Sequence, residues 1–115
     1  PMTRADLEAM FRAVDAADWD VVARFFHPDL VYDRPGYPRL VGRDEVARFY
    51  REVRSIRGEH QFEGFAIEPE SGACWGRFVG TRKDGTPLDL EFADCYRFKD
   101  GLLWRRKSYF YTPLA

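Results

Sequence analysis

The sequence predicts an α+β fold in which three N-terminal helices pack on a curved antiparallel sheet that forms a cone-shaped pocket. Up to about Gly58, apolar residues recur at helical spacing, and beyond it they mostly alternate with polar residues. The second half is interrupted at 70–72, 83–85 and 99–101, where glycine follows polar residues in the manner of hairpin turns. We therefore expect a single domain over residues 1–115.

The helices are expected in the first half. Thr3 and Asp6 form a capping box that begins a helix to about Ala16. A second, short helix contains Trp19, Val22, Phe25 and Phe26 and ends at His27-Pro28, and a third runs from Gly42 to Gly58. Residues 30–33 are expected to form a short strand, followed by a Pro- and Gly-containing loop. Four further strands are expected at about 60–68, 73–83, 87–98 and 102–112.

Composition excludes several classes of protein. The chain has 45% hydrophobic and 32% charged residues, which is typical of a globular domain. Its 18 basic and 19 acidic residues form no long block, so we expect neither nucleic acid nor an anionic membrane as a partner. No apolar run approaches the ~20 residues of a membrane span, and we see no secretory signal. A cytoplasmic location is the default expectation.

The few cysteines and histidines indicate no redox or metal chemistry. Cys74 and Cys95 are too few for a disulfide framework, and we expect them to be reduced. His27 and His60 are isolated, so no metal site is expected, and His60 should be exposed at the start of a strand. No Gly-rich phosphate loop is present, and we expect no cofactor. The high aromatic content of 17% instead favours a lined cavity or an interface.

The stretch Leu88–Phe98 contains the most informative residue. On one strand face, apolar side chains alternate regularly except at Asp94. A carboxyl group there must be paired, kept neutral, or used in chemistry. One interpretation is an Asp satisfied by a buried Arg or by backbone donors, and the other is a functional acid or base.

The neighbours of Asp94 depend on the two hairpin turns. A two-residue turn at Asp84-Gly85 would place Trp75 opposite Asp94 and Arg77 diagonal to it on the same face. In the last hairpin, a three-residue turn at 99–101 would send Trp104, Arg106, Ser108 and Phe110 to the Asp94 face. A two-residue turn would send Lys107, Tyr109 and Tyr111 there instead. We favour the three-residue turn.

Three motifs carry a family resemblance, and together with the order of elements it extends over almost the whole chain. Phe26–Val31, Gly42–Tyr50 and Phe92–Gly101 resemble the SnoaL-like polyketide cyclases and ketosteroid isomerases of the nuclear transport factor two-like superfamily. The resemblance implies a small-molecule pocket, chemistry without a cofactor, and a homodimer. Because this fold hosts many reactions, it implies the fold more specifically than the reaction.

The resemblance also implies roles for individual residues. Asp94 matches the position where ketosteroid isomerase keeps a protonated Asp as an oxyanion donor. Tyr50 matches a Tyr of that enzyme's hydrogen-bond network, and Asp33, with a one-residue shift, resembles its general base. Met10 stands where the isomerase has its main donor Tyr, so steroid isomerisation is not expected. Arg77 resembles an Arg of limonene-epoxide-hydrolase-like members.

These observations lead to two functional hypotheses. The first is a cofactor-free enzyme, of isomerase or polyketide-cyclase type, that acts on a hydrophobic carbonyl-bearing substrate by carboxylate acid/base chemistry. Its expected catalytic residues are Asp94, Asp33 and Tyr50, and its expected substrate-binding residues are Tyr32, Trp75, Arg77, Phe92, Arg106 and Phe110. The alternative is a non-catalytic ligand-binding or dimerisation module, in which Asp94 would be fully paired with Arg77 and would not contact the cavity.

Overall fold

The computed structural model describes residues 1–113. The helices are α1 (Arg4–Asp15), α2 (Trp19–Ala23) and α3 (Arg43–Arg48), and α3 continues into a π-helical segment, η1 (Phe49–Val53). The strands are β1 (Phe26–Asp33), β2 (Leu40–Val41), β3 (Arg57–Ile67), β4 (Ser71–Thr81), β5 (Pro87–Lys99) and β6 (Leu102–Phe110).

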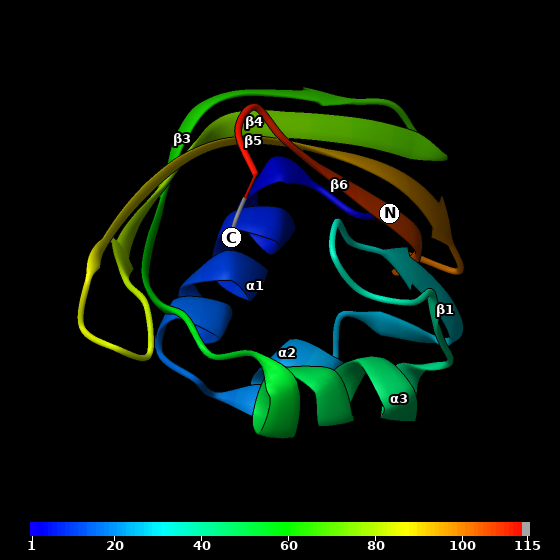
Figure 1. Ribbon diagram of the computed structural model, residues 1–115. Coiled ribbons are helices and arrows are strands. Elements are labelled where there is room, and N and C mark those ends of the chain that lie inside the picture. The colour runs from blue at the N-terminus through cyan, green and yellow to red at the C-terminus, as the bar shows by residue number, and fades with distance from the viewer. Residues whose placement is uncertain (114–115) are drawn as a thin grey trace.

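The strands form one curved sheet that wraps around α1. Their order is β2-β1-β6-β5-β4-β3. The predicted antiparallel meander from β3 to β6 is confirmed, but β1 runs parallel to β6, which makes the sheet mixed. Figure 1 shows α1 inside the concave side of the sheet, with α2 and α3 below it. The α+β fold class is therefore confirmed, with a sheet that is curved and not closed.

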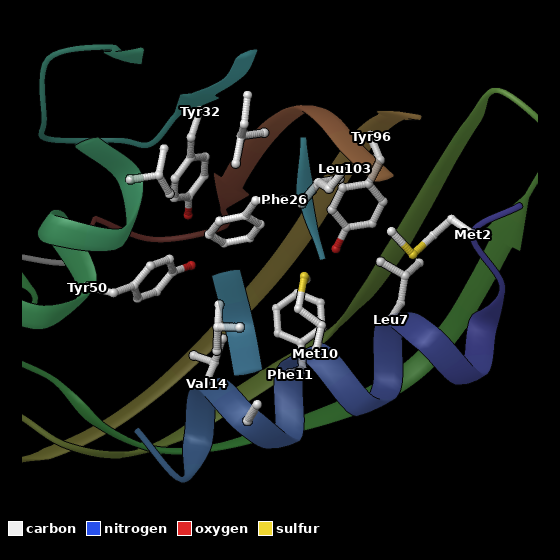
Figure 2. Close-up of a cluster of buried hydrophobic side chains, with 14 of the residues drawn as sticks. Met2, Leu7, Met10, Phe11, Val14, Phe26, Tyr32, Tyr50, Tyr96 and Leu103 are labelled. Atoms are coloured by element: carbon white, nitrogen blue, oxygen red, sulfur yellow. The ribbon is translucent and has the colours of Figure 1, made fainter. Parts of the chain in front are cut away.

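The first helix forms as its sequence predicts. The Thr3 hydroxyl accepts from the backbone N–H of Asp6, and the Asp6 carboxylate accepts from the backbone N–H of Thr3, which completes the capping box. The apolar stripe of α1 is buried against the sheet and includes Leu7, Met10 and Phe11. Figure 2 shows these side chains pointing from α1 into the core. Met10 is thus a core residue, fully enclosed by its neighbours.

The second helix is shorter than the sequence predicts, because Phe26 begins strand β1 instead. Phe26 pairs with Leu103 of β6, and the carbonyl of Phe25 accepts a hydrogen bond from the backbone N–H of Leu103. Proline at position 28 has no backbone N–H to continue a helix but is tolerated in a strand. Pairing with β6 therefore decides the conformation of this segment.

The predicted register between β4 and β5 is wrong by one residue. The backbone N–H of Arg82 donates to the carbonyl of Thr86, and that of Gly85 donates back to the carbonyl of Arg82. The turn thus has three residues and ends at Gly85, whose φ of +85° suits glycine. As a consequence Cys74, and not Trp75, lies opposite Asp94. A one-residue slip exchanges the two faces of a strand.

Trp75 and Arg77 therefore lie on the outer, convex face of the sheet. The Trp75 side chain is opposite Ala93, and the residue is 41% exposed. Arg77 donates hydrogen bonds of 2.9 Å to Asp89 and 2.9 Å to Glu91. The expectation that these two residues neighbour Asp94 is not met, because both point away from it.

The last hairpin combines features of both predicted alternatives. Its turn has two residues, Asp100 and Gly101, both with positive φ, and pairs Lys99 with Leu102. An irregularity between Arg97 and Phe98 then shifts the register and places Ser108 opposite Asp94. The prediction that Arg106, Ser108 and Phe110 share the Asp94 face is thus confirmed, although the favoured turn is wrong. Trp104 lies instead on the outer face, with the guanidinium of Arg105 4.0 Å from its ring centroid.

Candidate functional site

Asp94 is the centre of a buried hydrogen-bond network. Its residue is 1% exposed. Oδ1 accepts from the Ser108 hydroxyl at 2.6 Å, and Oδ2 accepts from the Tyr96 hydroxyl at 2.9 Å. Arg106 completes the set, with Nε at 3.1 Å and Nη2 at 3.0 Å from Oδ2. The carboxylate is therefore fully paired, as expected for an Asp satisfied by a buried Arg. Its partner is Arg106, however, and not Arg77.

The Tyr32 hydroxyl and the Cys74 thiol extend the network. Each donates a hydrogen bond to a hydroxyl that in turn donates to Asp94. Because the Ser108 proton is used on Asp94, the Tyr32 hydroxyl donates to the Ser108 oxygen at 3.0 Å. By the same reasoning, the Cys74 thiol donates to the Tyr96 oxygen at 3.0 Å. The network thus orders its protons around one acceptor.

Arg106 connects this network to Tyr50. Its guanidinium stacks 4.4 Å from the centroid of the Tyr32 ring, and Nη1 donates to the Tyr50 hydroxyl oxygen. Figure 2 shows the Tyr32 and Tyr50 hydroxyls pointing toward the same space above α1. Within residues 1–113, the Tyr50 proton has no hydrogen-bond acceptor, so Tyr50 retains a free donor.

Burial and nearby charges shift the pKa values of Tyr50 and Tyr32 in opposite directions. Burial raises the pKa of Tyr50, although Arg106 and Arg54 oppose the effect. Burial also acts on Tyr32, but the Arg106 and Arg34 guanidinium groups together outweigh it and lower the pKa of Tyr32. Tyr50 is therefore a neutral donor over the ordinary pH range.

A pocket of about 790 Å³ opens where α1, η1 and β3 approach the β4–β5 hairpin. This volume lies in the usual range of small-molecule sites. Tyr50 is in its lining, together with Trp19, whose ring stacks on Tyr50 at 5.4 Å. Asp94 is not in the lining. Tyr50 is accordingly the member of the network that reaches the pocket.

The sequence predicts a hydrophobic pocket, but seven of the 18 residues in this lining are charged. Its cationic members are Arg51, Arg54, Arg57, Arg82 and Lys83, and its acidic members are Asp15 and Glu52. Apolar contacts come mainly from Val14, Trp19, Val53 and Ile56. These charges come from three separate segments of the sequence, at 15, 51–57 and 82–83, which only the fold brings to one pocket.

Asp15 and His60 form a pair that sequence reasoning missed. Asp15 Oδ1 lies 2.6 Å from His60 Nδ1, and Asp15 Oδ2 accepts from the backbone N–H of His60 at 2.9 Å. The His60 ring is not exposed, because it packs among four phenylalanines: Phe11, Phe62, Phe78 and Phe92. Burial lowers the pKa of His60, although Asp15 opposes the shift. The two residues are 45 positions apart in sequence, so only the fold brings them together.

The structure divides the predicted site residues into two groups. Asp94, Tyr32, Tyr50 and Arg106 form the network described above. Phe92 and Phe110 lie opposite each other on adjacent strands. Asp33, in contrast, lies on the other side of β1 from Tyr32 and pairs with Arg39 at 2.9 and 3.0 Å. That pairing lowers the pKa of Asp33. Asp33 and Asp94 therefore do not share a site.

Asp33 instead lines a smaller depression of about 250 Å³, together with Arg39, Cys95 and Lys107. Among residues 1–113, no three His, Cys, Asp or Glu side chains are grouped as a metal site requires. Over the same residues, no helix has the length and apolar character needed to cross a membrane.

Solved structures with the same fold come from several bacteria. An LEH-like epoxide hydrolase from M. tuberculosis has a TM-score of 0.78 and 19% identity over 90% of this chain and 78% of its own. A protein named a polyketide cyclase from Xanthomonas campestris has a TM-score of 0.80 and 20% identity, over 90% and 85%.

A third structure is a hypothetical protein with a ketosteroid isomerase-like fold from Catenulispora acidiphila, solved in complex with trimethylamine. It has a TM-score of 0.81 and 16% identity, over 94% of this chain and 86% of its own. Identities this low show the fold alone. No curated protein sequence matches the chain.

The sequence profile of the SnoaL-like domain matches residues 7–106, which include every helix but the first residues of α1, and most of the sheet. The three motifs that resemble this family all lie within the match. The chain belongs to the SnoaL-like domain family.

Proposed function

We propose that this protein is a cofactor-free enzyme that acts on a hydrophobic, carbonyl-bearing small molecule by acid/base chemistry of isomerase or cyclase type. The observation that carries the proposal is the position of Tyr50. This residue lines the pocket and also accepts a hydrogen bond from Arg106, which is held by Asp94. A hydroxyl that belongs to a pocket-lining residue and is bonded to a buried ion pair is suited to stabilise developing negative charge.

In this proposal the Tyr50 hydroxyl donates a hydrogen bond to the oxygen of the substrate carbonyl. As a proton leaves the neighbouring carbon, negative charge builds on the carbonyl oxygen, and the Tyr50 hydroxyl stabilises the enolate. Arg106 polarises that hydroxyl, and Asp94 fixes Arg106. Asp94 is thereby a positioning residue, because it is 1% exposed and is absent from the pocket lining.

The proton acceptor that we propose is Asp15. It lines the same pocket as Tyr50, and its Oδ1 is held by His60. In a β,γ-unsaturated ketone, Asp15 would take a proton from the carbon between the carbonyl and the double bond and return it to the γ-carbon of the dienolate. The carboxylate is regenerated, and the net change is a shift of a double bond.

The test is the conversion of cyclohex-3-enone to its conjugated isomer, followed by ultraviolet absorbance, with α-proton exchange in D₂O followed by NMR. Tyr50→Phe should lower the rate by about 10²-fold, as expected for loss of an oxyanion donor. Asp15→Asn should reduce α-proton exchange to the background rate. Tyr111→Phe is the matched control, because Tyr111 is 83% exposed and absent from the pocket lining. Wild-type rates in Tyr50→Phe or Asp15→Asn would contradict the proposal.

The alternative function is a non-catalytic binding module, and the full pairing of Asp94 favours it. Under this alternative the Asp94 network is structural, and the pocket only holds a ligand. Wild-type protein would then bind carbonyl compounds but exchange none of their α-protons across a panel of cyclic ketones and β-diketones. Exchange above background that is lost in Asp15→Asn would exclude the alternative.

We further propose that the protein forms a homodimer through the outer face of the sheet. Trp75, Ala93 and Tyr109 are aligned there across β4, β5 and β6. Trp75 and Tyr109 remain 41% and 49% exposed. Exposed aromatic side chains in a row are enriched in protein interfaces.

A further inference from the structure

Three buried or largely buried guanidinium groups surround the tyrosine network, but the network contains a single carboxylate. Arg106 is paired with Asp94. Arg34 is 8% exposed, and burial lowers the pKa of Arg54. Within residues 1–113, neither Arg34 nor Arg54 forms an ion pair, and the Nε of each is buried without a hydrogen-bond partner. Positive charge is therefore in excess inside the protein.

Arg54 has aromatic neighbours in place of an anion. Its guanidinium lies 5.5 Å from the centroid of the Tyr50 ring and 5.3 Å from that of Phe78. Cation–π contacts recover part of the cost of removing a cation from water. They do not provide an acceptor for the N–H groups, and an unpaired buried charge is normally unfavourable.

The unpaired cation faces the pocket described above. Arg54 and Tyr50 are both in its lining. Arg51, Arg57, Arg82 and Lys83 add four cations to that lining, against Asp15 and Glu52. The whole chain has a net charge of −1, so this positive excess is local. A concave site with an excess of one sign of charge attracts ligands of the opposite sign.

We propose that the pocket selects an anionic ligand, whose carboxylate binds the Arg54 guanidinium while the rest of the molecule lies against Trp19 and Tyr50. A carboxylate offers acceptors in the geometry that a guanidinium fork recognises. If the proposed reaction is correct, on which this extension rests, the substrate is a carbonyl compound that also carries a carboxylate. Arg54 is then a specificity-determining residue.

The test compares two nearly isosteric probes by isothermal titration calorimetry: indole-3-acetate, which is anionic at neutral pH, and indole-3-acetamide, which is neutral. The acetate should bind about tenfold more tightly, as expected for a charge-assisted hydrogen bond. Arg54→Met should abolish this preference, and Arg54→Lys should retain part of it. Arg24→Met is the matched control and should behave as wild type, because Arg24 is exposed and lies outside the pocket lining.

Several results would overturn the inference. These are equal affinity for the two probes, tighter binding of the amide, no binding of either probe, or an unchanged preference in Arg54→Met. Circular dichroism of each variant verifies folding, and Arg54→Lys provides a second test if Arg54→Met does not fold. The failure of each proposal is distinguishable. Preference for the acetate without any α-proton exchange contradicts the proposed reaction alone, whereas turnover of cyclohex-3-enone without that preference contradicts the anion selectivity alone.

Discussion

Asp94 and Arg106 form an ion pair in which the two side chains are 1% and 5% exposed. Arg106 uses Nε and Nη2 on Asp94 and donates through Nη1 to Tyr50. The pair therefore connects strands β5 and β6 to Tyr50 in the pocket-lining segment η1. Because both charges are removed from water, each depends on the other for compensation.

The first prediction concerns this pair. Asp94→Asn should lower the free energy of unfolding by about 3–5 kcal/mol, because it leaves Arg106 buried without a counter-charge. Urea denaturation measures the loss. The double variant Asp94→Asn/Arg106→Met should recover part of it, since the orphaned cation is gone. A loss below about 1 kcal/mol would show that the pair contributes little to stability.

The second prediction is that Arg54→Met stabilises the protein. Removing a largely buried cation that has no anionic partner among residues 1–113 should raise the free energy of unfolding by about 1 kcal/mol, even though a ligand contact is lost. The melting temperature by calorimetry, with the exposed Arg24→Met as control, measures this gain. A lower melting temperature would contradict this prediction. It would mean that the aromatic contacts of Arg54 stabilise the folded state by more than the burial of its charge destabilises it.

The third prediction distinguishes the two thiols. Burial raises the pKa of Cys74 to about 12, and its thiol donates to Tyr96, whereas Cys95 is exposed. Since the thiolate is the reactive form, iodoacetamide should modify Cys95 alone in the folded protein. Peptide mass spectrometry before and after unfolding in urea identifies the modified residue. Equal labelling of both cysteines in the folded state would contradict the buried network.

The fourth prediction concerns pH. Burial lowers the pKa of His60 in the folded state. At pH values between the folded and unfolded pKa, the unfolded chain therefore binds a proton that the folded protein does not bind. This contribution to stability is complete above the unfolded pKa of about 6.5 and is lost as pH falls through the folded value. His60→Asn keeps a donor for Asp15 without the titrating ring. The variant should show a smaller loss of stability than wild type between about pH 7 and pH 5 in urea denaturation. An unchanged pH dependence would contradict the assignment.

The fifth prediction tests the proposed homodimer. Trp75→Glu places a charge in the aromatic row of the outer face and should convert a dimer to a monomer in sedimentation equilibrium. Val41→Glu is the control, because Val41 is exposed on the edge strand β2, away from that row. A wild-type monomer, or a Trp75→Glu dimer of undiminished affinity, would contradict the proposal.

Much of the fold follows from local sequence patterns. The capping box at Thr3 and Asp6, the helical stripe of α1 and the alternation along β5 each satisfy a local rule that the tertiary structure keeps. Asp94 stands out because it breaks the alternation, and it is the centre of the buried network. The glycine-containing breaks at 83–85 and 99–101 do separate strands of the meander, whereas the break predicted at 70–72 lies mostly within β4, and residues 68–70 make that turn without glycine.

The errors arise where turn length and side-chain partners depend on the whole fold. One additional residue in the turn before Thr86 moved Trp75 and Arg77 to the outer face. In the last hairpin, the predicted turn length is wrong by one residue. An irregularity between Arg97 and Phe98 shifts the register by one residue as well, so Arg106 still lies on the predicted face.

The sequence by itself determined the α+β class, the meander and the inward position of Asp94, because these depend on a period of 3.6 or 2 along the chain. Only the tertiary structure decided that Arg106 pairs with Asp94, that Asp15 meets His60, and that Arg54 lies beside Tyr50 without an ion-pair partner among residues 1–113. These contacts join distant segments, and a change of one residue in a hairpin redirects every side chain beyond it.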